Sequence, residues 1–230
     1  MDAYKSEFIR FMVRSNVLMF GEFVTKSGRR SPYFVNTGNY STGEEIAKLG
    51  EYYAECIVNN MHAGDISAEV VALFGPAYKG IPLAVSAAAA LSRKQVSVNY
   101  CFNRKEAKDH GEKGDIVGYR PKDGDRILII EDVLTAGTAL RECVPLLKAS
   151  AEVRVEGLVI SVDRMERGLK GKTASKELLD EFGIRTFPIV TVRDVLETLY
   201  NSPLDGVVHV NDEIKERMLA YFGEYCEIDI

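Results

Sequence analysis

The sequence predicts an α/β fold with an open, mostly parallel sheet flanked by helices and an N-terminal cap. Two observations indicate this class: apolar runs recur along the chain without polar alternation, and helical patterns separate them. Such runs suit strands covered on both faces, and alternating strands and helices are typical of parallel sheets. With 230 residues, of which 46% are hydrophobic, the chain can bury the core of one domain, predicted over 1–230.

The first part of the chain predicts one helix followed by an irregular passage. This passage, GEFVTKSGRRSPYFVNTGNYSTG at 21–43, is rich in Gly and Ser and indicates loops and short strands. We expect residues 1–42, approximately, to form the cap, or hood, over the sheet.

The rest of the chain supplies the sheet and its covering helices. The apolar runs predict strands at 69–74, 95–102, 126–130, 155–162 and 186–192. Apolar residues spaced by three and four predict helices at 46–57, 81–93, 140–147, 175–182, 192–200 and 213–222. Pro145 lies inside the third of these helices and is expected to kink or shorten it.

The composition disfavours several classes of protein. No apolar run approaches the roughly 18 residues of a membrane span, and the charged N-terminus does not resemble a signal peptide, so a cytoplasmic location is expected. A net charge of −5 disfavours nucleic acid or an anionic membrane as the main partner. The four cysteines lie far apart, which indicates reduced, buried thiols and no metal framework.

A candidate ligand site follows the strand predicted at 126–130. Glu131 and Asp132 stand at its carboxyl end, the edge where open sheets bind ligands, and the small residues 135–138 lead into the next helix. Such a turn can bind a phosphate through backbone N–H groups and the helix N-terminus. Carboxylates repel phosphate but accept hydrogen bonds from sugar hydroxyls or bind Mg²⁺, so a phosphorylated sugar fits both halves. The alternative is a strand that ends in solvated acids, with Thr138 as a helix cap.

Two further segments offer positive charge. LFGPAYKGIP at 73–82 follows a strand and places Lys79 at a helix start, although a Gly-Pro turn with an exposed lysine is common. NRKEAKDHGEKGD at 103–115 is either a solvated loop or a basic lid that closes over a polyanion. ERGLKGKT at 166–173 lacks the first glycine of a Walker A loop, and NYS at 39–41 is a chance glycosylation pattern.

These segments resemble a known family. ILIIEDVLTAGTA at 127–139 resembles the motif with which type I phosphoribosyltransferases bind phosphoribosyl pyrophosphate (PRPP): a hydrophobic strand, two acids and a TxGT loop. KSGRRSPYF, FGPAYKGIP, YCFNRKEAKDHGE and DRMERG together resemble the orotate phosphoribosyltransferases. The resemblance extends from Phe8 to about Val192. It departs from the common pattern at Glu131, where Asp is commoner, and at Val35, where an aromatic residue is often found.

The resemblance implies the type I phosphoribosyltransferase fold and transfer of 5-phosphoribosyl from PRPP to orotate. It also implies Mg²⁺ as cofactor, held mainly through PRPP, and a homodimer that shares the loop 103–115 across its interface. The implied PRPP-binding residues are Lys26, Tyr78, Lys79, Arg104, Lys105, Lys108, His110, Glu131, Asp132, Val133, Leu134, Thr135, Ala136, Gly137, Thr138 and Ala139. The implied orotate-binding residues are Lys26, Phe34, Val35, Thr135 and Arg164, and the implied catalytic residues are Asp132, Lys105, Lys108, His110 and Lys26.

Two other functions fit part of the same pattern. A PRPP-sensing regulator would keep the phosphate cradle, but it needs neither a basic closing loop nor the base-binding Lys26. A phosphoribosyltransferase for another base would keep the acidic pair, but a neutral purine gives Arg164 no carboxylate to bind. Neither alternative therefore uses all of the segments.

Overall fold

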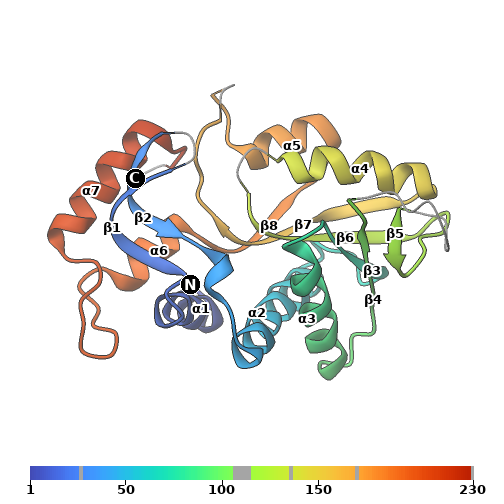
Figure 1. Ribbon diagram of the computed structural model, residues 1–230, viewed down its shortest axis with the longest axis horizontal. Helices are drawn as coiled ribbons and strands as arrows, with labels where there is room; N and C mark the ends of the chain where they lie inside the picture. Colours follow the sequence, from blue (N-terminus) through green and yellow to red (C-terminus); the bar gives the residue numbers. More distant parts are fainter. Residues whose placement is uncertain (26–27, 106–114, 135–136, 169–170, 229–230) are drawn as a thin grey trace.

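The protein contains a six-stranded, mostly parallel sheet with helices on both faces (Figure 1). A computed structural model describes residues 1–25, 28–105, 115–134, 137–168 and 171–228. The strand order is β5-β4-β3-β6-β7-β8, and only β5 runs antiparallel to its neighbour. The strands are β3 (Val70–Gly75), β4 (Asn99–Asn103), β5 (Ile116–Gly118), β6 (Arg126–Val133), β7 (Arg154–Asp163) and β8 (Thr186–Thr191). The predicted α/β class is confirmed.

Each face of the sheet has its own hydrophobic core. In β6, Leu128 and Ile130 belong to the core that also contains residues of α2 (Gly43–His62) and α3 (Gly80–Arg93). Ile127 and Ile129 belong to the other core, with residues of α4 (Thr138–Ser150) and α5 (Ala174–Phe182). Successive side chains of a strand point to opposite faces, so an uninterrupted apolar run supplies both cores.

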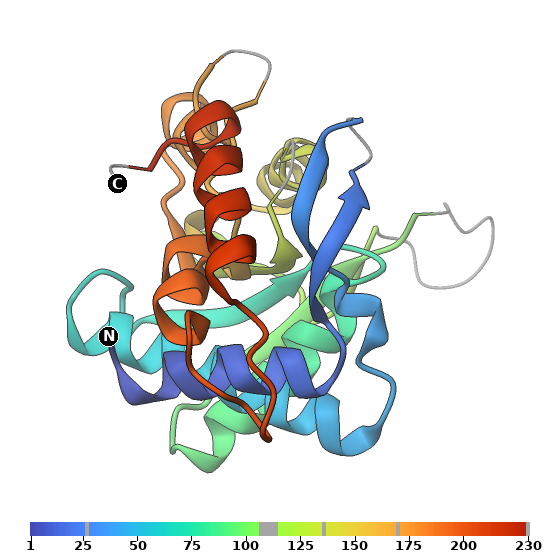
Figure 2. The same ribbon diagram turned by 90° about the vertical axis from the view of Figure 1, so that its left-hand side faces the viewer.

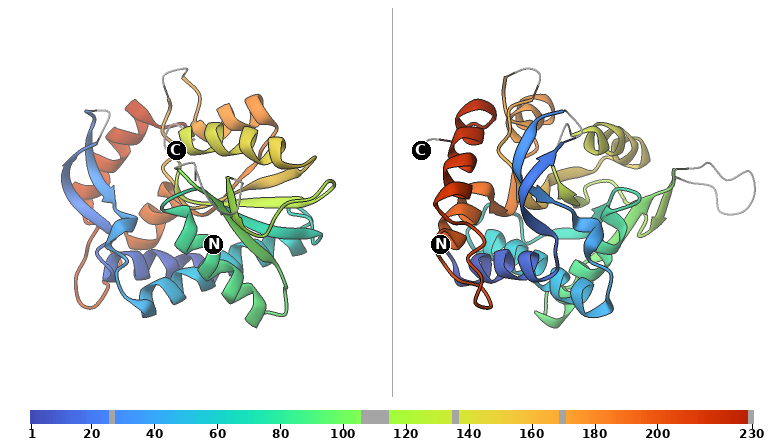
Figure 3. Two further views of the ribbon diagram at one scale, coloured as in Figure 1. Left: turned by 45° about the vertical axis from the view of Figure 1, so that its right-hand side comes forward. Right: turned by 60° about the vertical axis from the view of Figure 1, so that its left-hand side comes forward.

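The first strands form a separate hairpin. β1 (Leu18–Val24) pairs antiparallel with β2 (Arg30–Val35), after α1 (Ala3–Arg14) and before a 3-10 turn, η1 (Thr37–Asn39). The hairpin lies beside α7 (Asp212–Tyr225), as Figures 2 and 3 show. Tyr33 makes edge contacts with the rings of Tyr221 and Phe222, with centroids 5.8 and 6.4 Å apart. The hood hairpin is therefore supported by a C-terminal helix, which follows α6 (Val192–Leu199).

Two predicted strand boundaries differ from the structure by three or more residues, and one strand was not predicted. The strand expected to start at Gln95 starts at Asn99, because Gln95 has a φ of 63° and Val96 donates to Leu91 O in the turn that ends α3. β6 continues past Ile130 to Val133, since β7 pairs with it as far as Val162. The short strand β5 was not predicted, and three residues give too little pattern to detect.

Pro145 does not shorten its helix. α4 runs from Thr138 to Ser150 with Pro145 inside it, so the expected shortening is wrong, whereas the expected kink stays a prediction. The buried side chains of Val144 and Leu147 lie on either side of the proline and hold the helix against the sheet. Tertiary packing supplies most helical stability in proteins, so it can offset one lost backbone bond. None of the described helices is long and apolar enough to cross a bilayer.

Candidate active site

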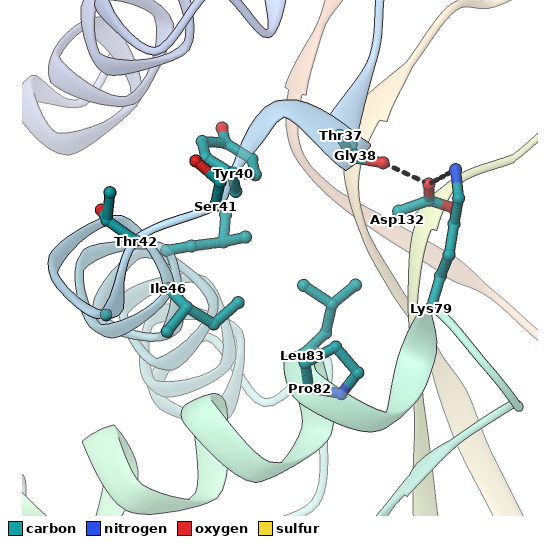
Figure 4. A pocket seen from close by; sticks show the side chains of 12 residues that line it. Thr37, Gly38, Tyr40, Ser41, Thr42, Ile46, Lys79, Pro82, Leu83 and Asp132 are labelled. Carbon is teal, nitrogen blue, oxygen red and sulfur yellow. Dashed lines mark hydrogen bonds and ion pairs between the residues drawn. The ribbon is translucent and has the colours of Figure 1, made fainter.

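An acidic pair stands at the carboxyl end of β6 and joins three elements of the fold. The carboxylate of Asp132 accepts hydrogen bonds from the Thr37 hydroxyl of η1 (2.5 Å) and from Lys79 Nζ at the start of α3 (3.0 Å) (Figure 4). The side chain of Asp132 is 13% exposed, whereas that of Lys79 is 65% exposed. Asp132 is thus held in place while its cationic partner can move to meet a ligand.

The backbone of the pair is fixed from the core. Tyr53 of α2 donates its hydroxyl to the carbonyl of Glu131 (2.7 Å), and Ser161 of β7 donates to the carbonyl of Asp132 (2.6 Å). Both donors come from elements that pack against β6. These bonds orient the two carboxylates before any ligand arrives, which is the preorganisation that a binding site requires.

The carboxyl group of Glu131 titrates near neutrality. Burial and then the adjacent charge of Asp132 raise its pKa from the ordinary value of 4.5 to about 7. A second negative charge beside Asp132 therefore becomes costly in the free protein. Sugar hydroxyls or a cation brought in with a ligand would stabilise it.

This raised pKa predicts a pH dependence of stability. Between pH 4.5 and about 7 the folded protein holds a proton on Glu131 that the unfolded chain has released. The Glu131 contribution to the free energy of unfolding is therefore fully present below pH 4.5 and is lost as pH rises through about 7. The free energy of unfolding should fall by at most about 3 kcal/mol over this range. Glu131→Gln should remove this loss. Denaturant titrations from pH 4.5 to 8 should show wild type weakening relative to the variant, and parallel curves would contradict the prediction.

The turn after the acids leads directly into α4. Gly137 is the N-cap residue in the left-handed conformation, with φ of 67°, and Thr138 is the first residue of α4. The alternative in which Thr138 caps the helix is wrong, because the cap is a glycine without a side chain. Thr135 and Ala136 lie outside the described residues, whereas Gly137 and Thr138 of the predicted cradle lie within them.

A cavity of about 200 Å³ opens at the N-terminus of α4. It is lined by Thr138 and Ala139 of α4, by Asn103 at the end of β4 and Lys105 after it, and by residues of the loop after β3. The complete lining is Pro76, Ala77, Asn103, Lys105, Thr138, Ala139, Glu142 and Cys143. A helix N-terminus and an exposed lysine that share one cavity provide a setting for an anion. Two other predicted PRPP residues do not line this cavity. Val133 lies in β6 and pairs with Val162, and Leu134 is buried in the core.

The loop after β3 carries Tyr78 and Lys79, two of the predicted PRPP residues. Tyr78 is 66% exposed, and Lys105 Nζ lies 5.8 Å from the centroid of its ring. The backbone N–H of Ala77 donates to Asn103 Oδ1 (2.8 Å), and the peptide bond from Ala77 to Tyr78 is cis. The loop after β3 and the chain after β4 therefore lie together, as a shared site requires.

A larger cavity of about 360 Å³ lies beside Asp132 and Lys79 (Figure 4). Its walls come from the segment Thr37–Gly43, from Ile46 and Leu49 of α2, and from Pro82 and Leu83 of α3. Thr37 and the rest of this wall were not predicted, because the sequence gives no signal that η1 reaches β6.

Three of the predicted orotate residues, Phe34, Val35 and Arg164, lie in the hood and in the loop after β7. Phe34 stacks on Phe23 with centroids 5.4 Å apart, and Val35 pairs with Leu18 across the hairpin. Arg164 is 8% exposed and lies with its guanidinium 4.8 Å from the centroid of the Tyr33 ring. The structure therefore places Arg164 under the hood, beside the strand that carries Phe34.

Other predicted site residues are less defined. Arg104 follows β4, where its backbone N–H donates to Asp115 O. Lys26, Lys108 and His110 lie outside the described residues. Within the described ranges no cluster of three or more His, Cys, Asp or Glu side chains could hold a metal ion. Glu131 and Asp132 offer the hard oxygen donors that Mg²⁺ prefers, which fits an ion held mainly by substrate phosphates.

Comparison with known proteins agrees with this geometry. Residues 36–191 match the model of the phosphoribosyl transferase domain. An orotate phosphoribosyltransferase of Clostridium beijerinckii is 52% identical over 226 residues, which cover 98% of this chain and 99% of the relative. One of Agathobacter rectalis is 49% identical over 228 residues, covering 98% of this chain and 99% of the relative.

A solved structure shows the same fold. The crystal structure of orotate phosphoribosyltransferase from Francisella tularensis matches with a TM-score of 0.80 and 33% identity, over 96% of each chain. The similarity thus spans the hood, the sheet and the C-terminal helix. The chain belongs to the orotate phosphoribosyltransferase family.

Proposed function

We propose that the protein transfers the 5-phosphoribosyl group of PRPP to orotate, giving orotidine 5′-monophosphate and pyrophosphate. The observation that carries the proposal is that one strand end, β6, presents two carboxylates and the N-terminus of α4, with Lys79 facing the second carboxylate. Acids for sugar hydroxyls and a helix N-terminus for phosphate suit the two ends of ribose 5-phosphate.

The proposed placement of PRPP follows from these positions. The 5-phosphate binds at the start of α4, in the turn that ends with Gly137, and the ribose hydroxyls face Glu131 and Asp132. The pyrophosphate binds beside Tyr78 and Lys79. Arg104, Lys105, Lys108 and His110 close over it, and Lys26 is proposed to serve both substrates.

The chemistry depends on charge. As the bond between C1 and pyrophosphate breaks, the ribose gains positive character and the leaving group gains negative charge. The carboxylate of Asp132 stabilises the ribose, and the lysines of the site stabilise the leaving group. Mg²⁺ bound with the pyrophosphate would supply further positive charge. Orotate is an anion held nearby, so its position can replace a strong general base.

The base is proposed to be selected by Arg164, together with Phe34, Val35 and Thr135. A guanidinium binds a carboxylate through two parallel hydrogen bonds, and orotate carries a carboxylate that uracil and purines lack. The test is pyrophosphate release from PRPP and Mg²⁺ with orotate, uracil or hypoxanthine. We expect release with orotate. Release with hypoxanthine alone would favour another base, and no release with any base would favour a PRPP sensor.

Lys105→Ala should lower turnover much more than it lowers stability. Lys105 is exposed beside Tyr78, so the free energy of unfolding should change by no more than about 0.5 kcal/mol. Loss of a cation beside the leaving group should lower kcat by roughly 100-fold. Lys215→Ala is a matched control, because Lys215 lies over the ring of Tyr200, remote from β6. Equal loss of stability and turnover in Lys105→Ala would contradict the proposed role.

Four broader features come from the sequence or from its resemblance to the family, and they stay predictions. The homodimer with a shared loop 103–115, the cytoplasmic location, the use of Mg²⁺ and a single domain with residues 1–42 in the hood belong to this group. Sedimentation of the purified protein tests the first of them directly.

A further inference from the structure

Arg164 is held by a largely buried cluster that joins the hood, the loop after β7 and the C-terminal helix. We call the cluster of Tyr33, Arg164, Glu166 and Tyr221 the Arg164 clamp. Glu166 Oε1 accepts hydrogen bonds from Arg164 Nε (2.8 Å) and Nη2 (2.5 Å), and also from the hydroxyl of Tyr221 (2.7 Å). The ring of Tyr33 covers one face of the guanidinium. Tyr221 is 4% exposed and Tyr33 is fully buried.

The backbone beyond α7 is tied to the same loop. Arg167 N–H donates to Tyr225 O (2.8 Å), Glu227 N–H donates to Met165 O (2.9 Å), and the Cys226 thiol lies 3.5 Å from Arg164 O. The loop that carries Arg164 is thus tied to residues 225–227 at Arg164 itself and at Met165 and Arg167, which follow it. α7 lies outside the range 36–191 that matches the phosphoribosyl transferase domain.

The clamp fixes an otherwise variable side chain. Glu166 accepts from the Nε and Nη2 edge of the guanidinium, and Nη2 also donates to the Tyr221 hydroxyl (3.5 Å). Among the described residues no partner of Nη1 is seen, so a ligand carboxylate would approach the edge formed by Nη1 and Nη2. Arginine has many rotamers, so ordering it before the substrate arrives removes an entropic cost from binding. A nearly buried cation also needs a compensating charge, and Glu166 supplies it while Arg29 Nη1 lies 3.4 Å from its other oxygen.

We propose that Glu166 and Tyr221 are positioning residues that set Arg164 for the carboxylate of the pyrimidine substrate. α7 thereby helps to determine base specificity, although it lies outside the part of the chain that binds PRPP. This inference rests on the proposed role of Arg164. Glu166 acts as a support for the arginine, and the substrate carboxylate does not displace it.

The test uses two conservative variants of the full-length protein. Tyr221→Phe removes one hydroxyl, and Glu166→Gln removes the charge while keeping an acceptor. Each should raise the KM for orotate roughly tenfold, the size expected for a hydrogen bond to a charged group. The KM for PRPP should stay within about twofold. The preference for orotate over uracil should fall, because uracil has no carboxylate for Arg164.

Matched controls make the same chemical changes elsewhere. Tyr200→Phe removes a hydroxyl that donates to Asp212 (2.9 Å). Glu227→Gln, in the segment after α7, removes the negative charge that pairs with Lys176. Neither side chain contacts Arg164 in the described parts of the chain. Both controls should leave the two KM values within about twofold of wild type. If Glu166→Gln fails to fold, Tyr221→Phe decides the matter alone, because removing one hydroxyl preserves the packing of the ring.

The outcomes separate this inference from the proposed role of Arg164. Arg164→Ala with an unchanged KM for orotate would overturn that role itself. If Arg164→Ala raises the KM for orotate but Tyr221→Phe and Glu166→Gln do not, only the clamp is wrong. Tighter binding of orotate by Glu166→Gln would show that Glu166 competes with the substrate, which also overturns the inference. An equal rise in both KM values would indicate a general structural role and contradict positioning.

Discussion

Asp132→Asn is expected to lower the turnover of PRPP by at least about 100-fold. Asparagine keeps the shape of the side chain and can still accept a hydrogen bond from the Thr37 hydroxyl. It loses the charge that pairs with Lys79 and that faces the ribose in the proposed reaction. The loss should therefore appear in kcat for the forward reaction, measured as pyrophosphate released at saturating orotate and PRPP.

The same variant should fold normally. Lys79 is 65% exposed, so its ion pair with Asp132 is screened by water and should contribute no more than about 1 kcal/mol. Asp125→Asn is a matched control at the opposite end of β6, where the carboxylate accepts from the Tyr119 hydroxyl and from Lys122 N–H. The control should keep nearly full activity. Turnover of Asp132→Asn within tenfold of wild type would show that the negative charge is dispensable.

Gly75→Ala is expected to destabilise the protein by about 3 kcal/mol and to abolish PRPP binding. A Cβ atom on residue 75 would lie 2.2 Å from the carbonyl oxygen of Gly80 and 2.5 Å from its carbon. Both contacts are with backbone, so no side chain can move aside. The turn between β3 and α3 must shift, and with it Lys79 at the start of α3.

A helical glycine provides the control for this prediction. Gly223 lies in α7, and a Cβ atom there would meet nothing within 4 Å. Gly223→Ala should leave stability unchanged or raise it by up to about 1 kcal/mol, because alanine favours the helix. Urea titrations of both variants measure the two effects. A Gly75→Ala protein as stable and active as wild type would mean that the β3 to α3 turn is less tightly packed than the structure shows.

The sequence could predict the features that depend on local patterns. Apolar runs located the five parallel strands of the large sheet, and the acids that follow Ile130 predicted a candidate site at its edge. The exact extent of β6 depended on its partner, because β7 continues beside it to Val162. The turn at 95–98 was assigned to a strand because Val96 and Val98 are apolar, although a positive φ at Gln95 ends the preceding helix there.

Long-range contacts could not be predicted. Thr37 reaches Asp132 across 95 residues, and Tyr221 reaches Glu166 across 55 residues. No spacing in the sequence links such positions, because the folded sheet and the hood bring them together. Glu166 had a local signal, since it stands two residues after Arg164 in DRMERG. A carboxylate that close to a proposed anion-binding arginine could have been expected to pair with it.

The central claim is that the carboxyl end of β6 binds both ends of ribose 5-phosphate. A crystal structure of the protein with ribose 5-phosphate tests it most directly. We expect the phosphate against the N-terminus of α4 and the 2- and 3-hydroxyls within hydrogen-bond distance of Glu131 and Asp132. A well-ordered sugar phosphate bound elsewhere, with no ligand density beside Asp132, would contradict the claim.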